Sequence, residues 1–182
     1  MKKIILLVTV VCSLISFQSF AQKQGPPPRP PRPLPMMDTP QYQKGSEMPA
    51  FKIRKLDSTT IFNTYDIPKG KPTMLMLFMP DCEHCQKQVE RMIAGMDSIS
   101  NVQIYLFSPL PVFKIKEFYD KYHLADYKNI TLVGQEYEFF FASYYKATSV
   151  PFIAVYNHNK KLMRAFQGSA GLKEIEMAAN SK

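Results

Sequence analysis

The sequence predicts an α/β fold in which helices cover both faces of a mixed, mainly parallel sheet. Short apolar runs rich in β-branched and aromatic residues alternate with segments whose apolar residues recur at i, i+3, i+4 and i+7, the period of a helix buried on one face. Strands that alternate with helices are typical of such covered sheets. In addition, a cysteine pair follows an apolar strand directly and falls in the first turn of the next helix.

The expected elements follow one another in a regular order. Strands are expected over residues 51–56 and 59–63, then a turn over 68–72, the central strand over 73–78, and the cysteine helix up to about residue 95. The remaining elements are a strand over 102–107, a helix over 112–122, a short strand over 130–133, a short helix or turn over 137–145, hairpin strands over 151–156 and 162–167, and a final helix over 172–179.

Residues 1–21 have the pattern of a secretory signal. Two lysines precede an apolar run over residues 4–15, and small residues stand at Ser19 and Ala21. We expect cleavage after Ala21, export, and no stable membrane insertion afterwards, because the apolar run is short for a membrane span. The alternatives are an uncleaved anchor and a lipoprotein, although Val11 is a poor fit to the small residue that lipid attachment at Cys12 requires.

Residues 22–44 form a predicted linker. Seven prolines fall within the eleven residues from Gly25 to Pro35, which favours extended polyproline II and excludes helix or sheet. We interpret this segment as a spacer, with docking onto an aromatic groove of a partner as the alternative. One domain is then expected over residues 45–182.

The net charge of the chain does not indicate a nucleic-acid partner. Six of the 23 basic residues and one of the 15 acidic residues precede Gly45, which leaves 17 basic and 14 acidic side chains in the predicted domain. These charges form no basic run of the kind that nucleic-acid-binding segments carry.

Cys82 and Cys85 carry the predicted chemistry. Unpaired backbone N–H groups and the positive end of the helix dipole meet at a helix start, so a thiolate on Cys82 is favoured there. Two intervening residues allow Cys85 to reach back and close a short disulfide, which is a reversible two-electron couple. Zinc is the competing interpretation, but it needs four ligands, and only the distant His123 and His158 remain, so no metal site is expected.

Pro151 is the second informative residue, because it leads into a predicted strand after Thr148, Ser149 and Val150. A proline is tolerated at the first residue of a strand, which is the plain interpretation. The functional interpretation is that the Val150–Pro151 peptide bond is cis.

The order of these elements resembles the thioredoxin fold. Residues 45–182 resemble its exported branch, the redoxin or TlpA/ResA-like thiol-disulfide oxidoreductases, in Gly45-x-x-x-Pro49-x-Phe51, in the turn over 69–72, in Phe78 ahead of the cysteines, and in the later proline. The resemblance implies an N-terminal strand extension, and the positions between Cys85 and Pro151 leave room for the helix–strand insertion of that branch.

The resemblance also implies roles for single residues. Cys82 is the attacking thiol, Cys85 resolves the mixed disulfide, and a cis Val150–Pro151 bond lies against the pair and binds extended substrate. It implies no cofactor, a periplasmic location, protein thiols and disulfides of the cell envelope as substrates, and an unidentified redox donor or acceptor protein. Whether the pair reduces, oxidises or reshuffles its clients is left open, with a reductase or redox-homeostasis role as the expectation.

His84 stands directly before the resolving cysteine, where the oxidising DsbA family also has a histidine. An imidazole N–H near Cys82 favours the thiolate, while the flanking carboxylates of Asp81 and Glu83 oppose it. We therefore expect a modest tuning role for His84, with an exposed helix-start residue as the alternative.

The chain departs from the family pattern at three positions. Asp81 replaces the usual tryptophan, Met76 replaces the buried aspartate of many thioredoxins, and Gln88 replaces a glutamate that TlpA-like proteins often carry. No obvious buried carboxylate is left to deprotonate Cys85.

Three other functions compete with thiol–disulfide exchange on this fold. A peroxiredoxin lacks support because Pro80 is only two positions before Cys82, whereas the peroxiredoxin signature has a wider spacing. A copper-delivery protein of the Sco type needs a wider cysteine spacing, and the methionines at 74, 76, 79, 92 and 96 fit core packing. A non-catalytic binding or metal-delivery module is the true rival, because fold alone does not fix function.

Overall fold

The structure is a computed structural model that describes residues 42–181. By its internal contacts the chain divides into two units, Met1–Met36 and Met37–Lys182, and the described residues all belong to the second. The predicted signal and nearly all of the predicted linker lie outside the described residues. Over residues 42–181, no helix has the length and apolar character needed to cross a bilayer.

Seven strands and four α-helices make up the described part of the chain. The strands are β1 (Lys52–Lys55), β2 (Ile61–Asn63), β3 (Thr73–Leu77), β4 (Gln103–Ser108), β5 (Ile130–Gln135), β6 (Phe152–Tyr156) and β7 (Leu162–Gln167). The α-helices are α2 (Glu83–Ala94), α3 (Val112–Lys121), α4 (Phe140–Tyr145) and α5 (Leu172–Ala179), and three short 3-10 turns lie at Thr64–Asp66, Met96–Ile99 and Leu124–Asp126. Every element predicted from the sequence is present, within one or two residues at most ends.

All seven strands form one sheet in the order β2-β1-β5-β4-β3-β6-β7. The predicted α/β class and mixed sheet are therefore confirmed, but the expectation that parallel pairing dominates is wrong. Only β3–β4 and β4–β5 pair in parallel, and the other four pairs are antiparallel. The helices between β3, β4 and β5 make these three strands run in the same direction. The β1–β2 and β6–β7 hairpins join the sheet with antiparallel pairing instead.

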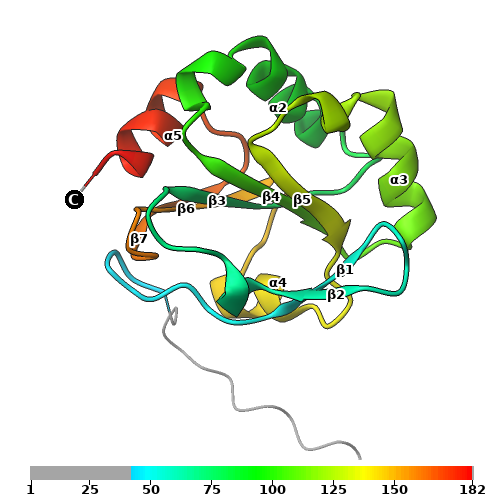
Figure 1. Cartoon of the computed structure of the whole chain (residues 1–182), viewed down its shortest axis with the longest axis horizontal. Coiled ribbons are helices and arrows are strands. Elements are labelled where there is room, and N and C mark those ends of the chain that lie inside the picture. Colours follow the sequence, from blue (N-terminus) through cyan, green and yellow to red (C-terminus); the bar gives the residue numbers. More distant parts are fainter. Residues whose placement is uncertain (1–41, 182) are drawn as a thin grey trace, which may run out of the picture. The chain divides into compact units, whose positions relative to one another are not determined.

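Helices lie on both faces of the sheet, as expected. α2, α3 and α5 cover one face, and α4 lies on the other (Figure 1). Because side chains alternate along a strand, β3 sends Met74 and Met76 toward the first face and Leu75 and Leu77 toward the second. Both faces are therefore buried, which explains why the whole of β3 is apolar apart from Thr73.

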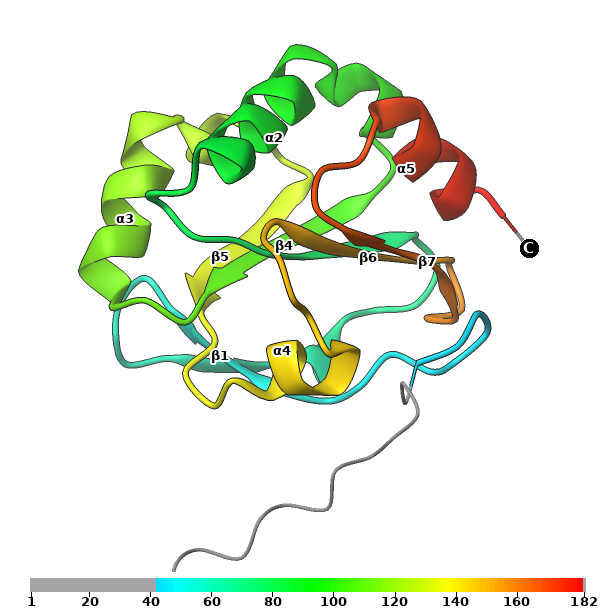
Figure 2. The same cartoon turned by 180° about the vertical axis from the view of Figure 1, so that it is seen from behind.

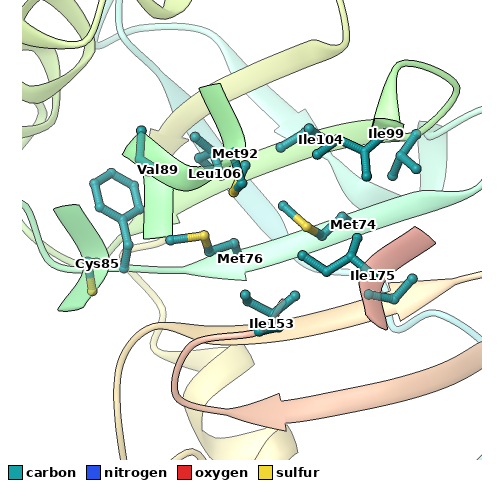
Figure 3. Packing of buried hydrophobic residues seen from close by; sticks show 14 of the residues in the cluster. Met74, Met76, Cys85, Val89, Met92, Ile99, Ile104, Leu106, Ile153 and Ile175 are labelled. Atoms are coloured by element: carbon teal, nitrogen blue, oxygen red, sulfur yellow. The ribbon is translucent and has the colours of Figure 1, made fainter. Parts of the chain in front are cut away.

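Three of the five methionines that were predicted to pack in the core are fully buried, whereas Met79 and Met96 are half-buried. Met74, Met76 and Met92 are fully buried and pack with aliphatic side chains of the sheet beneath α2 (Figure 3). Cys85 is fully buried as well and lies at one end of this cluster. The apolar face of α2 therefore fixes the position of Cys85 in the first turn of this helix.

Glu136 is a buried carboxylate that sequence reasoning did not single out. It follows β5 directly, is 1% exposed, and accepts hydrogen bonds from the backbone N–H groups of Glu138 (3.0 Å), Phe140 (3.3 Å) and Phe141 (3.3 Å). Burial raises its pKa above the ordinary value, against the opposing effect of these three donors. Glu136 thus binds the otherwise unpaired N–H groups at the start of α4.

Replacing Glu136 with alanine is expected to destabilise the fold by about 2 kcal/mol, because buried N–H groups at the start of α4 lose their acceptor. Glu138→Ala is the matched control, since the Glu138 side chain is exposed and its ion pair among residues 42–181 is with Lys52 at the surface. Urea unfolding of both variants measures the difference. A Glu136→Ala protein as stable as the control would contradict the capping role.

Candidate active site

Cys82 occupies the N-cap position of α2. The chain leaves β3 at Leu77, and Phe78 is still held against the neighbouring strand because its N–H donates to the carbonyl of Phe107. Cys82 is partly buried, and its Sγ accepts a hydrogen bond from the backbone N–H of Cys85 at 3.4 Å. A sulfur in this position meets the unpaired N–H groups of the first turn, which stabilise negative charge.

Cys85 lies one turn further into α2 and differs sharply from Cys82. Its side chain is 0% exposed, and its Sγ accepts a hydrogen bond from the Met79 N–H at 3.5 Å. Burial raises the pKa of the Cys85 thiol from 9.0 to about 12, and the Met79 N–H opposes the shift while neighbouring Cys82 adds to it. The two cysteines are free thiols in this structure. The pair thus combines one accessible sulfur with one buried, protonated sulfur.

The predicted cis bond is present between Val150 and Pro151. The structure also brings this segment to the cysteines, because the Cys82 thiol donates a hydrogen bond to the carbonyl oxygen of Val150 at 3.8 Å. Pro151 is buried, and its own carbonyl accepts from the N–H of Gly168 at the end of β7. The cysteines after β3 and the Val150–Pro151 segment before β6 therefore meet at the same end of these two strands. This end is called the Cys82 edge below.

His84 is exposed on the first turn of α2. Its recorded electrostatic neighbour is Glu83, whose pKa is lowered first by Lys87 and slightly by His84. No contact between the imidazole and Cys82 is recorded over residues 42–181. The tuning role of His84 therefore stays a prediction.

Gln88 is a buried polar residue on the apolar face of α2. Its Oε1 accepts the N–H of Ala170 at 2.9 Å, and the Arg91 guanidinium donates to the Ala170 carbonyl at 3.2 Å, so two side chains of α2 bind both backbone groups of one residue ahead of α5. The Gln88 Nε2 has no hydrogen-bond partner among the described residues. The signal for this contact was available in the sequence, because a glutamine follows Cys85 by three positions on an otherwise apolar stripe.

The sequence predicts a core position for Met79, and the structure shows that its backbone also belongs to the site. Its N–H is the donor to Cys85, and its sulfur accepts a hydrogen bond from Ser108 Oγ at 3.8 Å. Ser108 ends β4, next to the strand that leads to the cysteines. A backbone donor has no side-chain signature, which is why sequence reasoning missed it.

The described residues contain no group of three or more histidine, cysteine, aspartate or glutamate side chains that could hold a metal ion. His123 precedes the 3-10 turn Leu124–Asp126 in a left-handed conformation, and His158 is exposed in the β6–β7 turn. Neither is recorded near the cysteines. The residues at the site are those of thiol chemistry: an accessible sulfur, a second sulfur behind it, and main-chain donors to both.

Comparison with known proteins agrees with this geometry. A family model described as the AhpC/TSA family matches residues 44–174. The chain belongs to the AhpC/TSA family. Comparison with curated protein sequences gives no significant match.

Solved structures similar to this family member include several thiol-disulfide oxidoreductases. A secreted Mycobacterium tuberculosis disulfide oxidoreductase homologous to Escherichia coli DsbE aligns with a TM-score of 0.56 at 16% identity, over 70% of this chain and 92% of its own. The thioredoxin domain of a Bacteroides vulgatus thiol-disulfide oxidoreductase gives 0.58 at 18%, over 76% and 99%. StoA from Bacillus subtilis gives 0.51 at 12%, over 71% and 96%. These likenesses confirm the predicted thioredoxin-like fold, and together with the family they confirm the enzyme class, a thioredoxin-like oxidoreductase.

Proposed function

We propose that this protein exchanges disulfides with proteins of the bacterial cell envelope, in the direction of reduction, through Cys82 and Cys85. The observation that carries the proposal is the asymmetry of the pair: Cys82 is accessible and receives the Cys85 N–H, whereas Cys85 is fully buried with a pKa of about 12. An attacking thiol has to reach its client as a thiolate, and a resolving thiol needs to reach only its neighbour. The domain limits, the cleavage after Ala21 and the periplasmic location are part of the same proposal.

In the first step, the Cys82 thiolate attacks one sulfur of a client disulfide. The bond between Cys82 and that sulfur forms as the client S–S bond breaks, and the other client sulfur leaves as a thiolate that takes up a proton. The Cys85 N–H, 3.4 Å from Cys82 Sγ, supports the attacking sulfur before the step. The client is then held on Cys82 as a mixed disulfide.

In the second step, Cys85 gives up its proton and attacks the Cys82 sulfur. The Cys82–Cys85 disulfide forms, the mixed disulfide breaks, and the client sulfur leaves as a thiolate and is protonated. The client has gained two electrons and two protons, and the enzyme has lost them. The Met79 N–H supports the negative charge that forms on Cys85.

Val150 and Pro151 are proposed to hold the client next to Cys82. The Val150 carbonyl lies 3.8 Å from the Cys82 sulfur, so a chain bonded to that sulfur passes along the segment that precedes β6. An extended polypeptide offers backbone groups to such a segment.

Peroxide reduction is the second candidate, because the family is named for AhpC and TSA. The local sequence favours disulfide exchange instead. Pro80 stands two positions before Cys82, unlike the wider spacing of the peroxiredoxin signature, and the second cysteine lies one helical turn away in the same helix. A peroxidase is expected to consume hydrogen peroxide with dithiothreitol as reductant, whereas this protein is expected not to.

The direction of the reaction is tested by the reduction potential against glutathione, for the wild type and His84→Ala. We expect the wild type to be more reducing than glutathione and to reduce insulin. We also expect His84→Ala to become more negative by on the order of 30 mV, since an imidazole N–H that favours the thiolate stabilises the reduced form. A wild-type potential well above that of glutathione would make the protein an oxidant, and an unchanged potential in His84→Ala would leave His84 without a redox role.

A further inference from the structure

Lysines gather at the end of the sheet opposite Cys82. Lys69 and Lys71 lie in the turn before β3, Lys160 and Lys161 lie in the β6–β7 turn, and Lys44 lies in the first described segment. We call these five lysines the basic patch. β3 runs from this end to the cysteine end, so its five residues, at about 3.3 Å each, separate the basic patch from Cys82 by roughly 16 Å of strand.

Several contacts bring the three segments of the basic patch together. The Gly70 N–H donates to the His158 carbonyl at 2.9 Å, which joins the turn before β3 to the β6–β7 turn. The Gly45 N–H donates to the Leu162 carbonyl at 2.7 Å, which joins the first described segment to the start of β7. Figure 2 shows the β6–β7 turn beside the segments that enter β1 and β3.

The positive charges of the basic patch exceed the negative charges around it. Glu47 pairs with Lys161, and its pKa is lowered first by that pair and then by Lys69 and Lys160. The pKa of Lys160 is lowered first by partial burial and then by Lys69, with Asp66 and Glu47 opposing. Five lysines therefore face two carboxylates, and the remaining charge is unneutralised.

An exposed aromatic ring lies within the basic patch. The side chain of Tyr65 is 77% exposed, the largest exposure among the large hydrophobic residues of the described chain, and its carbonyl accepts a hydrogen bond from Lys160 Nζ at 3.0 Å. A hollow of about 450 Å³, lined in part by Lys44 and Lys161, lies at the same end. Lysines around an exposed tyrosine are the composition of surfaces that sit at the headgroup level of a bilayer.

We propose that the basic patch docks this domain onto an anionic phospholipid surface and turns the Cys82 edge away from the membrane. The sequence before residue 42 adds Lys23, Arg29 and Arg32 against Asp38, so the exported chain carries further positive charge besides the basic patch. The proposed export places the protein among membranes and away from nucleic acids. The redox chemistry of Cys82 is independent of this docking.

The test uses the chain from Gln22 to Lys182 and its co-sedimentation with vesicles of phosphatidylcholine, with and without phosphatidylglycerol. Binding is expected only to vesicles that contain phosphatidylglycerol, and it is expected to weaken as salt rises. The variant Lys44→Gln/Lys69→Gln/Lys71→Gln removes three exposed side chains for which the described residues record no hydrogen bond or ion pair. It is expected to lose about fivefold in partition for each lysine.

The matched control removes three lysines at the Cys82 end of the sheet, Lys52→Gln/Lys114→Gln/Lys146→Gln. Lys52 begins β1, Lys114 lies in the first turn of α3, and Lys146 follows α4, where its carbonyl accepts a hydrogen bond from Gln167 at the end of β7. It is expected to lose less than about fivefold in total, because these charges lie more than a Debye length from the bound surface. Equal losses in both triple variants, or no preference of the wild type for phosphatidylglycerol, would overturn the proposal. Tighter binding to duplex DNA than to these vesicles, with the same dependence on the basic patch, would assign the surface to another polyanion.

The orientation has a separate readout. Alkylation of Cys82 by iodoacetamide is expected to proceed within about twofold of the same rate on vesicles and in solution, because the membrane covers the opposite end. Protection of Cys82 on vesicles would show that the Cys82 edge faces the membrane, which contradicts the proposed orientation. Thiol–disulfide exchange in solution is unaffected by either result, so failure here and failure of the proposed reaction are distinguishable.

Discussion

Cys85→Ser is expected to accumulate client proteins covalently bound to Cys82. The first step remains intact, since Cys82 keeps its position at the start of α2 and the backbone N–H of residue 85 is unchanged by the substitution. The second step is abolished, because no thiol lies behind the mixed disulfide. Non-reducing gels of cells that express the variant, followed by mass spectrometry of the adducts, measure the trapped species.

Cys82→Ser is the decisive partner variant, and it is expected to trap nothing. The remaining Cys85 sulfur is fully buried and holds its proton at neutral pH, so its attack on an external disulfide is expected to fall by about a thousandfold or more. Insulin reduction should fall to the level of the uncatalysed control in both variants. Adducts on Cys82→Ser would show that Cys85 is the attacking thiol and Cys82 the resolving one.

The rate of the second step is expected to rise about tenfold for each pH unit from about pH 7 to about pH 10, because only the Cys85 thiolate attacks. An exposed thiol has a pKa near 9.0 and would level off there, but burial raises the Cys85 pKa to about 12, so the rise continues beyond it. Part of the shift comes from Cys82 and is lost once Cys82 is in a disulfide, while burial, the largest cause, remains. The high pKa therefore makes resolution slow at neutral pH.

A chromogenic mixed disulfide makes this step visible. Cys82 is first reacted with 5,5′-dithiobis(2-nitrobenzoate), and the attack of Cys85 then releases the coloured thiolate at a rate that can be followed across pH. Cys85→Ser, which cannot release it, is the control. A plateau below about pH 9 would mean that a base already lies next to Cys85 and removes its proton. In that case Gln88→Glu, which adds a carboxylate to α2, would be expected to leave the pH profile unchanged.

Much of this fold was predictable because periodicity reports burial. The run from Thr73 to Leu77 is buried at every position, and the expected central strand matches it. Strand direction was not predictable, since β6 and β7 are ordinary strands in the sequence and only their pairing in space makes most of the sheet antiparallel. β5 also continues past its predicted end through Gly134, where a side chain would clash with Arg54 of β1.

The site was predictable to the extent that side chains define it. The cysteines and Pro151 were recognisable in the sequence, and the structure brings Val150 to Cys82 as the resemblance implied. The donors to both sulfurs are backbone N–H groups, and these cannot be recognised from the residue types in the sequence. Glu136 was equally hidden, because a glutamate among polar and aromatic neighbours has the same appearance in a sequence whether it caps a helix in the interior or faces water.

Because the donors to both sulfurs are main-chain groups, the side chains around the cysteines can vary during evolution without loss of these hydrogen bonds. Asp81, Glu83 and His84 are all exposed, and none of them supplies a hydrogen bond to either cysteine. Substitutions at these three positions leave the N–H groups of Met79 and Cys85 in place, provided that α2 still begins at Cys82. Natural variation can therefore alter the charge presented to clients, and with it client choice, and tune the reduction potential modestly through His84, while the backbone hydrogen bonds to both sulfurs are inherited unchanged.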